Sequence, residues 1–409
     1  MGHISRRAVL ASAGLGAMAA GIPVGWGEEP SEPGPGGGEA ASGQPPLALA
    51  EYRPQSMLHV KKTHIERARY PVIDFHTHVT ESAHEVNGVA IGEARVFNGK
   101  AQELLPVMDR RNLRALVNLT GGFGAGLRDS VSQLDRSHEG RFYSMTEPSY
   151  NLFGEGRYPQ LQAEAIEQAH RDGARGLKIL KTLGLFLREH TTTGTLVKID
   201  DPRFDPMWET CGSLNMPVAI HVSDPVAFFR PTDRYNERYE ELNNHPDWSF
   251  AATEYPSNAE LLEARNRVFA RHPKTTFVGL HVGNFAEDLE NVSANLDRFP
   301  NMYVDIAARI NELGRQPRAA RRFFDRYQDR IVFGTDATPH GDAFPQQFFG
   351  DDLYQVYFRF LETDDEYFDY APAPVPPQGR WHISGIELPD DVLHKVYNQN
   401  ACRILNITV

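Results

Sequence analysis

Short apolar runs alternate with longer amphipathic segments along the chain after Tyr70. Eight runs of six or seven residues have the length of buried strands, and most are rich in Val, Ile, Leu and Phe. These predicted strands cover residues 72–78, 114–120, 141–147, 175–180, 217–222, 276–282, 302–307 and 330–335. Amphipathic stretches that often end at Gly or Pro predict helices between most of them, at residues 101–112, 159–173, 204–214, 257–273, 285–300 and 316–329.

This alternation of strands and helices predicts a parallel sheet. Eight such units after Tyr70 suit a (β/α)8 TIM barrel, with an open doubly wound sheet as the alternative. Two long insertions follow the fifth and eighth strands, at residues 223–256 and 337–389. In a barrel both would lie on the C-terminal face, where active sites are built, and loops of this length usually form functional lids.

The first part of the chain differs in kind from the rest. Residues 1–27 carry Arg6 and Arg7 before a mildly apolar Ala/Gly/Leu run and resemble a twin-arginine-type signal peptide. A lone membrane anchor is the alternative, but the run is short and Gly-rich for a span. Residues 28–67 are predicted to be a flexible linker and lead-in, followed by the barrel domain at 68–409. We therefore expect an exported, periplasmic protein with no stable membrane span after signal cleavage.

Composition and charge narrow the range of partners. The formal net charge is −12 and the isoelectric point about 5.7, which argues against nucleic acid or anionic lipid as a partner. The two cysteines, Cys211 and Cys402, are far apart and form no disulfide framework, so we interpret them as small core residues. We expect a small-molecule substrate, and the composition leaves a homo-oligomer open.

Polar residues gather at the ends of the predicted strands. His76 and His78 lie two apart in the first strand, where alternation places them on one inward face with Asp74 one layer deeper. Two imidazoles with this spacing can bind one metal ion. His221, His281 and Asp336 occupy the C-terminal ends of the fifth, sixth and eighth strands. Because the carboxyl ends of barrel strands meet at one mouth, these residues predict a shared site.

This arrangement resembles the amidohydrolase superfamily. The signature of that superfamily is His-x-His on strand one, His on strands five and six, and Asp after strand eight. The triplet "GTD" at 334–336 and the tail "VYNQNACRIL" at 396–405 are most similar to its amidohydrolase-related branch, which also contains the aminocarboxymuconate-semialdehyde decarboxylase type. The resemblance covers about residues 70–409.

The resemblance implies a role for each of these residues. It assigns a divalent metal, expected to be Zn²⁺, to His76, His78, His221 and Asp336. It also implies that His281 is catalytic and polarises the substrate, and that Asp336 moves a proton from water to the leaving group. In binuclear members a carboxylated lysine near the end of strand four bridges two metals, and Lys178 is the candidate here, although it could instead anchor a substrate carboxylate. We expect one ion rather than two.

Weaker candidates surround these residues. Those just after strands five, six and seven that could bind a polar substrate are Arg230, Asn284, Asp305 and Arg309. His84 and His340 could flank the site, but loop positions are the simpler interpretation for both.

The predicted function is a metal-dependent hydrolase that uses metal-activated water on an amide, ester or lactone of a small molecule. The alternative is a metal-dependent non-oxidative decarboxylase of a carboxylated small molecule, because the branch contains both chemistries. A phosphoesterase of the PHP type would need further His and Asp motifs that the sequence lacks. A non-enzymatic barrel would be favoured by loss of a ligand, and all five strand-end residues are present.

Overall fold

The computed structural model describes residues 47–48, 51–52, 54–339, 347–373 and 376–408. The chain divides into two compact units, Met1–Leu58 and His59–Val409. The described residues of the first unit are exposed. The predicted signal peptide at 1–27, with Arg6 and Arg7, lies outside the described residues, and so does His340.

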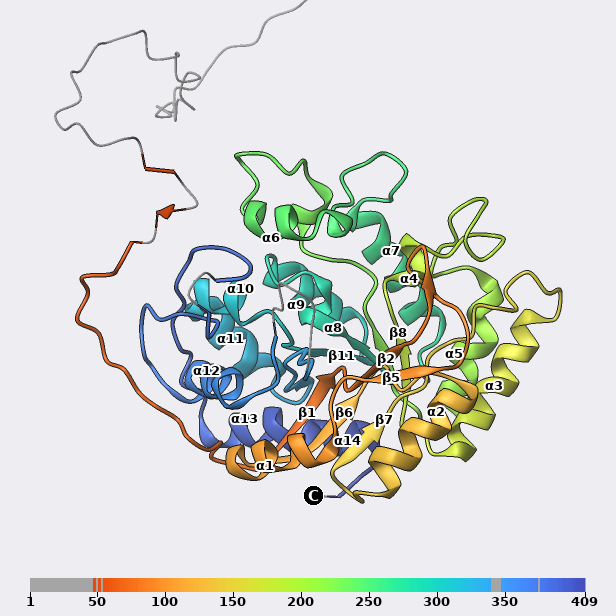
Figure 1. Ribbon diagram of the computed structural model, residues 1–409, viewed down its shortest axis with the longest axis horizontal. Helices are drawn as coiled ribbons and strands as arrows, with labels where there is room; N and C mark the ends of the chain where they lie inside the picture. The colour runs from red at the N-terminus through yellow and green to blue at the C-terminus, as the bar shows by residue number, and fades with distance from the viewer. Residues whose placement is uncertain (1–46, 49–50, 53, 340–346, 374–375, 409) are drawn as a thin grey trace, which may run out of the picture. The chain divides into compact units, whose positions relative to one another are not determined.

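Eight parallel strands form the centre of the second unit (Figure 1). They are β1 (Val72–Thr77), β6 (Leu113–Asn118), β7 (Phe142–Ser144), β8 (Leu177–Ile179), β9 (Val218–Ile220), β10 (Phe277–Gly279), β11 (Met302–Asp305) and β12 (Ile331–Val332). They pair in chain order as β1-β6-β7 and β8-β9-β10-β11-β12. A parallel bridge between Thr146 and Leu177 joins β7 to β8.

The circle of strands closes where the first strand meets the last. The amide of Phe75 donates to the carbonyl of Phe333 at 3.0 Å, and the amide of Asp336 donates to the carbonyl of His76 at 2.8 Å. The same pattern continues beyond the strand ends, where the amide of His78 donates to the carbonyl of Ala337 at 2.8 Å. The predicted (β/α)8 TIM barrel is therefore confirmed, and each predicted strand overlaps an observed one.

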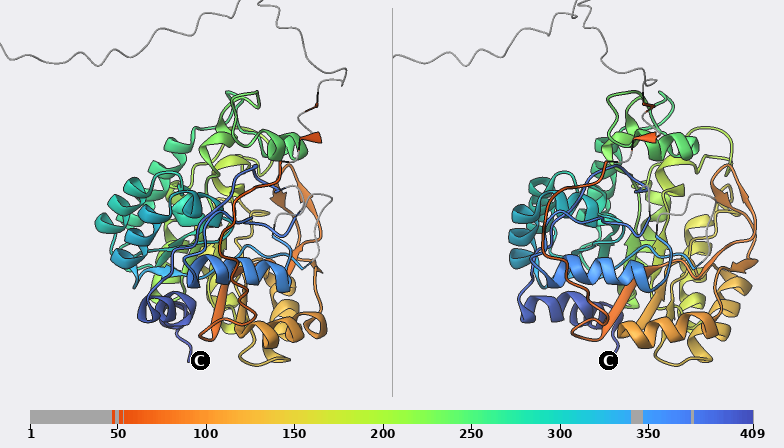
Figure 2. Two further views of the ribbon diagram at one scale, coloured as in Figure 1. Left: turned by 90° about the vertical axis from the view of Figure 1, so that its left-hand side faces the viewer. Right: turned by 60° about the vertical axis from the view of Figure 1, so that its left-hand side comes forward.

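Helices lie outside the strands (Figures 1 and 2). Six fall where amphipathic periodicity predicted them: α1 (Ala101–Arg111), α3 (Tyr158–Asp172), α5 (Asp205–Ser213), α7 (Asn258–Arg271), α9 (Leu289–Arg298) and α11 (Pro317–Tyr327). Local signals explain their ends. Ser257 and Glu260 form a capping box at the start of α7, and Gly173 ends α3 with a φ of 118°, a conformation that glycine adopts without strain.

The sequence did not predict several further elements. These helices are α2 (Gly124–Ser130), α4 (Thr182–Leu185), α6 (Tyr239–Asn244), α8 (Leu280–Asn284), α10 (Ile310–Arg315), α12 (Asp351–Glu362), α13 (Asp390–His394) and α14 (Asn400–Leu405). Four short strands follow β1: β2 (Thr80–Ser82), β3 (Glu85–Val86), β4 (Val89–Ala90) and β5 (Arg95–Phe97). Short 3₁₀ or π segments are η2 (Val131–Arg136), η3 (Pro202–Phe204), η4 (Val226–Phe229), η5 (Pro246–Trp248) and η6 (Lys395–Gln399).

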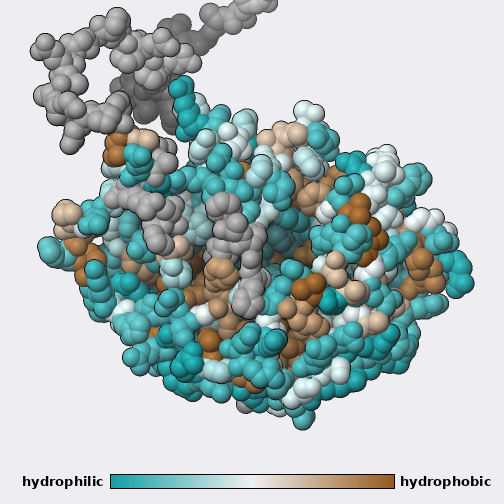
Figure 3. Space-filling view, viewed as in Figure 1, coloured by the Kyte–Doolittle hydropathy of each residue, from teal (hydrophilic) through white to brown (hydrophobic). Residues whose placement is uncertain are grey.

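Both predicted insertions contain helices. α6 lies in the segment 223–256, and α12 lies in the segment 337–389. α12 is amphipathic, with seven of its twelve residues buried and with Asp352, Gln355, Arg359 and Glu362 at helical spacing on its polar side, so the sequence did carry a signal for this helix. Figure 3 shows a hollow on the face of the molecule drawn there, with hydrophobic side chains along part of its edge.

The barrel interior is apolar and sealed at its N-terminal end. Residues from strands on different sides of the barrel form one buried cluster that includes Ile73, Phe75, Ala115, Val117, Ala219, Val278 and Val332. Ala401, Ile404 and Leu405 of α14 complete this cluster. Asn400 in the same helix donates to the carbonyls of Gln328 and Ile331, which precede and begin β12, so α14 lies beneath the strand starts.

The predicted inward face of the first strand needs correction. Alternation placed Asp74 on the inward face, but Ile73 and Phe75 occupy the interior, and Asp74 instead accepts hydrogen bonds from Thr335 and Tyr354. The register of β1 against β6 shifts between Asp74 and Thr77, which explains why simple alternation fails before His76. Among the described residues, no helix is long and apolar enough to cross a membrane.

Candidate metal centre

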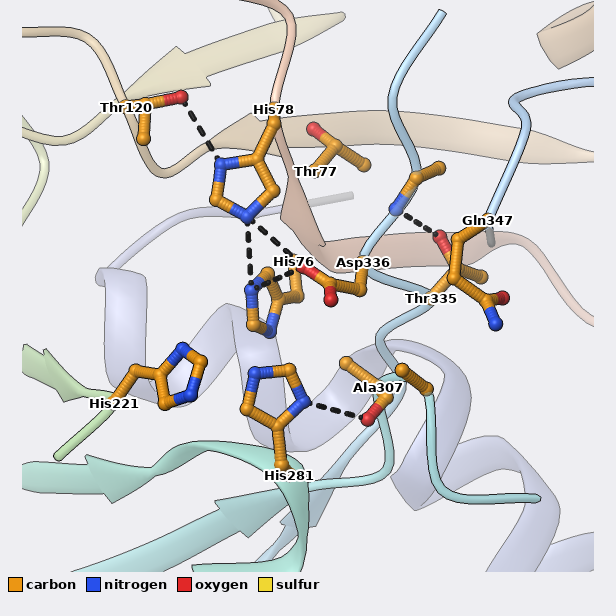
Figure 4. A network of polar contacts seen from close by, with 12 residues as sticks. His76, Thr77, His78, Thr120, His221, His281, Ala307, Thr335, Asp336 and Gln347 are labelled. Atoms are coloured by element: carbon orange, nitrogen blue, oxygen red, sulfur yellow. Dashed lines mark hydrogen bonds and ion pairs between the residues drawn. The ribbon is translucent and has the colours of Figure 1, made fainter. Parts of the chain in front are cut away.

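The five strand-end residues meet at the C-terminal mouth of the barrel. His76 lies near the end of β1 and His78 one residue beyond it, while His221, His281 and Asp336 follow β9, β10 and β12. Figure 4 shows His76, His78, His281 and Asp336 turned toward a common centre, with His221 at its edge. The predicted convergence is therefore present in the structure.

Asp336 is the focus of the cluster. Its Oδ1 lies 3.0 Å from Nε2 of His76 and 2.9 Å from Nε2 of His78, and these two nitrogens are 3.3 Å apart. Ligand atoms of His76, His281 and Asp336 all lie within 4.8 Å of one another, a spacing that could hold a metal ion. His281 thus belongs to the tightest group, although the resemblance assigned it a role beside the metal.

The hydrogen-bond partners fix which nitrogen carries the proton in three of the rings. Nδ1 of His76 lies 2.6 Å from Oδ2 of Asp305, and Nδ1 of His281 lies 2.9 Å from the carbonyl oxygen of Ala307. Both partners can only accept, so both Nδ1 atoms donate. Nδ1 of His78 lies 3.1 Å from the hydroxyl oxygen of Thr120.

The hydroxyl of Thr120 leads to the same assignment for His78. That hydroxyl donates to the carbonyl of Thr80, so its oxygen accepts from His78 Nδ1. In their neutral forms His76, His78 and His281 therefore all direct an Nε2 lone pair into the cluster.

These lone pairs meet a carboxylate and need a positive charge between them. Nε2 of His281 is buried and has no hydrogen-bond partner among the described residues. Burial lowers the pKa of His281 well below its ordinary value and also lowers that of His78, which keeps both rings neutral. Burial alone would raise the pKa of Asp336, but the neighbouring histidines, His76 foremost, hold it well below its ordinary value, so the carboxylate is ionised. Three imidazoles and one carboxylate fit a divalent ion such as Zn²⁺.

Asp305 holds two members of the cluster from beneath. Its Oδ2 accepts from His76, and its Oδ1 accepts from the backbone amide of His281. The sequence suggested that Asp305 could bind a polar substrate. Its side chain is instead fully buried and supports the histidines. A carboxylate at the end of the seventh strand was the available signal for this role.

A left-handed turn presents His281. The φ angles of His281, Val282, Gly283 and Asn284 are 55°, 57°, 65° and 58°, and such angles cost roughly 1–2 kcal/mol for each non-glycine residue. Arg265, buried in α7, donates to the carbonyl of Gly283 and secures the turn. Asn284 accepts from the amide of Val222 at 3.2 Å, so this predicted substrate-binding residue joins the loops after β9 and β10.

His221 is held differently from the other rings. Its Nε2 lies 3.1 Å from Oδ1 of Asp224, whose Oδ2 accepts from Lys181 at 2.8 Å. Burial lowers the pKa of His221 to about 4. The ring centroid of His221 is 4.4 Å from that of His281, which places His221 against the cluster. Sequence reasoning missed Asp224, although an acid three residues after a strand-end histidine was a visible signal.

Comparison with known proteins identifies the family. Residues 156–407, which include His221, His281 and Asp336, match the family model described as Amidohydrolase. The chain belongs to this amidohydrolase family. Members of the family are typically metal-dependent, in keeping with the cluster of His76, His281 and Asp336. No curated protein matches the chain.

Several solved structures resemble this amidohydrolase at low sequence identity. An uncharacterised TIM-barrel protein from Bordetella bronchiseptica is 15% identical, covers 75% of this chain and 83% of its own, and has a TM-score of 0.44. A 2,6-dihydroxybenzoate decarboxylase from Rhizobium is 14% identical, with coverages of 82% and 99% and a TM-score of 0.49. A probable 2-pyrone-4,6-dicarboxylic acid hydrolase from Acinetobacter baumannii is 13% identical, with coverages of 82% and 100% and a TM-score of 0.46.

A cation lines a cavity beside the amidohydrolase cluster. Lys178 is fully buried on β8, and its Nζ has no hydrogen-bond partner among the described residues. Burial lowers the pKa of Lys178 to about 8, against the opposing charges of Asp336 and Asp305. A small open cavity is lined by Ala90, Phe123, Glu147, Pro148, Tyr150, Lys178, Leu180 and Thr182. Its walls are largely apolar, with Lys178 at one side.

The remaining candidates divide by burial. Arg309 is buried at the start of α10 and donates to the carbonyl of Ala308, next to the residue that holds His281. Arg230 and His84 are exposed, which fits the loop position expected for His84 and gives no support to a substrate-binding role for Arg230. Only Arg309 therefore remains beside the cluster.

Proposed function

We propose that this chain is a metal-dependent hydrolase that cleaves an amide, ester or lactone bond of a small molecule. One observation carries the proposal. The Nε2 lone pairs of His76 and His78 lie against Oδ1 of Asp336, and His281, whose buried Nε2 has no hydrogen-bond partner among the described residues, belongs to the same group. A proton could neutralise only one of these contacts, whereas a divalent cation would neutralise all of them. The tight group of His76, His281 and Asp336 favours one ion, with Zn²⁺ the expected metal.

The residues around the ion have distinct tasks in this proposal. A bound divalent ion supplies Lewis-acid chemistry, because it lowers the pKa of water and polarises a substrate oxygen. Asp336 is ionised and partly exposed, so it can accept a proton from the attacking water and return it to the leaving group.

His281 differs from the role that the resemblance implied. Its Nδ1–H is committed to Ala307, so a neutral ring presents an acceptor, not a donor that could polarise a carbonyl. His281 therefore fits better as a ligand beside His76, or as a base, with His78 and His221 completing the histidines around the ion.

The test combines metal content with labelled product. Purified protein should carry close to one equivalent of divalent metal, and the zinc-loaded protein should be assayed on lactones, esters, amides and carboxylated phenols in ¹⁸O-labelled water. Hydrolysis incorporates the label into the organic product. Two equivalents of metal, with one lost in Lys178→Met, would replace the single-ion site with a bridged one. Absence of bound metal after reconstitution would contradict the proposal.

Decarboxylation is the second candidate because buried cations flank the cluster. Lys178 and Arg309 could hold a substrate carboxylate away from water while carbon dioxide leaves. The same experiment separates the two reactions, since decarboxylation releases carbon dioxide and leaves no label in the organic product. That outcome would replace the first proposal with the second.

We also propose export to the periplasm by a twin-arginine signal. The proposal rests on Arg6 and Arg7 ahead of a weakly apolar run at the start of the sequence. Replacing both residues by Lys should retain the precursor in the cytoplasm, as followed by cell fractionation and immunoblotting. Unchanged export of that variant would contradict the proposal, and replacing Lys61 and Lys62 by Arg provides a control for altered basic residues elsewhere.

A further inference from the structure

Asp224 occupies an unusual place beside the cluster. It is only 4% exposed, yet both of its oxygens are used: Oδ1 lies 3.1 Å from Nε2 of His221, and Oδ2 lies 2.8 Å from Nζ of Lys181. Its backbone is also secured, because Asn258 donates to the Asp224 carbonyl at 3.1 Å. A buried side chain with so many fixed contacts can control the orientation of a neighbouring ring.

The proton arrangement of His221 is the reverse of that in the other rings. His76, His78 and His281 carry the proton on Nδ1, as their partners require. A carboxylate can only accept, so His221 must donate through Nε2. The lone pair of the neutral ring is then on Nδ1, which has no hydrogen bond among the described residues.

We propose that Asp224 is a positioning residue that holds His221 as the Nε2–H tautomer and leaves Nδ1 to face the metal centre. This inference rests on the proposed metal site and extends it, because it assigns one ring of the centre the opposite nitrogen. Lys181 also takes part in orienting His221, through its contact with Asp224. It keeps Asp224 in its acceptor state and determines how any replacement side chain must turn.

Lys181 is itself fixed by its surroundings. Its Nζ lies 5.5 Å from the ring centroid of Trp248 and 5.4 Å from that of Phe250, both in the insertion after β9. Burial alone would raise the pKa of Asp224, but the charge of Lys181 and the bond to His221 hold it well below its usual range. The insertion therefore takes part in orienting His221, through aromatic rings that hold the lysine.

Replacing Asp224 by Asn gives a specific expectation. The ammonium of Lys181 can only donate, so it should attract the amide oxygen and turn the amide NH₂ toward Nε2 of His221. That ring would then carry its proton on Nδ1, and the lone pair would face away from the centre. Because a residue supporting a ligand histidine typically contributes 10–100-fold to metal affinity, Zn²⁺ binding by Asp224→Asn should weaken by about this factor.

A double variant sharpens the test. In Asp224→Asn/Lys181→Met no ammonium dictates the amide orientation, so the amide oxygen can again accept from Nε2. We expect this variant to recover at least part of the lost Zn²⁺ affinity, measured by competition with a chromogenic chelator. A purely structural role for Asp224 predicts the reverse, since a second substitution in a buried pair should add damage.

The chain offers a matched control. Asp205 contacts Nε2 of His272 at 3.0 Å, the same type of pair, but on α5 at the outside of the barrel. Asp205→Asn should disturb its histidine comparably and leave Zn²⁺ affinity within about twofold of the unaltered protein. Similar losses of affinity in Asp205→Asn and Asp224→Asn would show a general effect on folding and overturn the proposal.

The tautomer can also be read directly, without activity or metal. In metal-free protein with ¹⁵N-labelled histidine, the ring signals of His221, assigned by their loss in His221→Gln, should show the Nε2–H form. Asp224→Asn should shift them toward the Nδ1–H form. An Nδ1–H ring in the unaltered protein would overturn the proposal even if Asp224→Asn fails to fold. If the protein binds no divalent ion, the proposed function fails, whereas this measurement still tests Asp224.

Discussion

The two ends of the barrel differ in whether their buried polar groups have hydrogen-bond partners. At the N-terminal end, the Asn400 amide donates to two carbonyls, and α14 seals the interior with Ala401, Ile404 and Leu405. At the C-terminal end, Lys178 Nζ and His281 Nε2 are buried without a hydrogen-bond partner among the described residues. The N-terminal end is closed by contacts within the protein, whereas the buried polar groups at the C-terminal end require a bound ligand to satisfy them. Stability and function should therefore be separable by mutation.

The largest expected effect comes from Asp336→Asn at the C-terminal end. This change removes the charged oxygen that meets both His76 and His78, so metal affinity should fall by at least about 100-fold and activity should be lost. Chelator competition and elemental analysis measure the loss. Asp325→Asn, on the outer helix α11, should bind metal normally. Full metal occupancy in Asp336→Asn would remove the central argument for the site.

The next effect is expected at the opposite end. Leu405→Ala opens a cavity beneath the strand starts and should lower the free energy of unfolding by about 2–5 kcal/mol. Urea unfolding of the metal-free protein measures this change. Metal affinity of the folded variant should stay that of the unaltered protein. If affinity fell while stability did not, the two ends would not be separable.

The smallest effect concerns the buried ammonium of Lys178. Burial lowers its pKa to about 8 from the ordinary 10.5. Between these pH values the unfolded chain binds more protons than the native protein, so the free energy of unfolding should rise with pH. Lys178→Met should remove this contribution and flatten the rise in metal-free protein, as measured by urea unfolding at several pH values. The exposed control Lys198→Met should keep the slope; equal slopes in all three proteins would refute the assignment.

Local sequence patterns predicted the fold and the location of the site. Seven of the eight strands lie inside their predicted runs, and β6 begins one residue before its run, because short apolar runs bounded by turn residues are a local signal. Strand-end positions also placed His221, His281 and Asp336 at one mouth, since parallel strands share direction. α12 was not predicted although its polar residues recur at helical spacing, because it lies inside a segment that was interpreted as one long loop.

The finer features of the site depend on contacts between distant segments. The register shift in β1 that turns Asp74 out of the interior is invisible in the sequence. The proton positions of His76 and His281 depend on Asp305 and Ala307, which come from the end of the seventh strand, whereas Asp224 lies only three residues after its partner His221. The left-handed turn at His281 contains only one glycine, Gly283, so the sequence gives little sign of it. Such features follow from tertiary pairing and cannot be read from composition or periodicity.

The seam between β1 and β12 also constrains the order in which the protein can be assembled during translation. His76 and Asp336 face each other across this seam, and their backbones are joined by a hydrogen bond of 2.8 Å. A chain leaving the ribosome presents β1 first, while β12 and the sealing helix α14 are synthesised after all the other strands. His76 and His78 therefore remain without their partner Asp336 until most of the domain has been synthesised. A nascent chain halted before α14 would hold every proposed ligand and still lack the helix that closes the N-terminal end of the barrel.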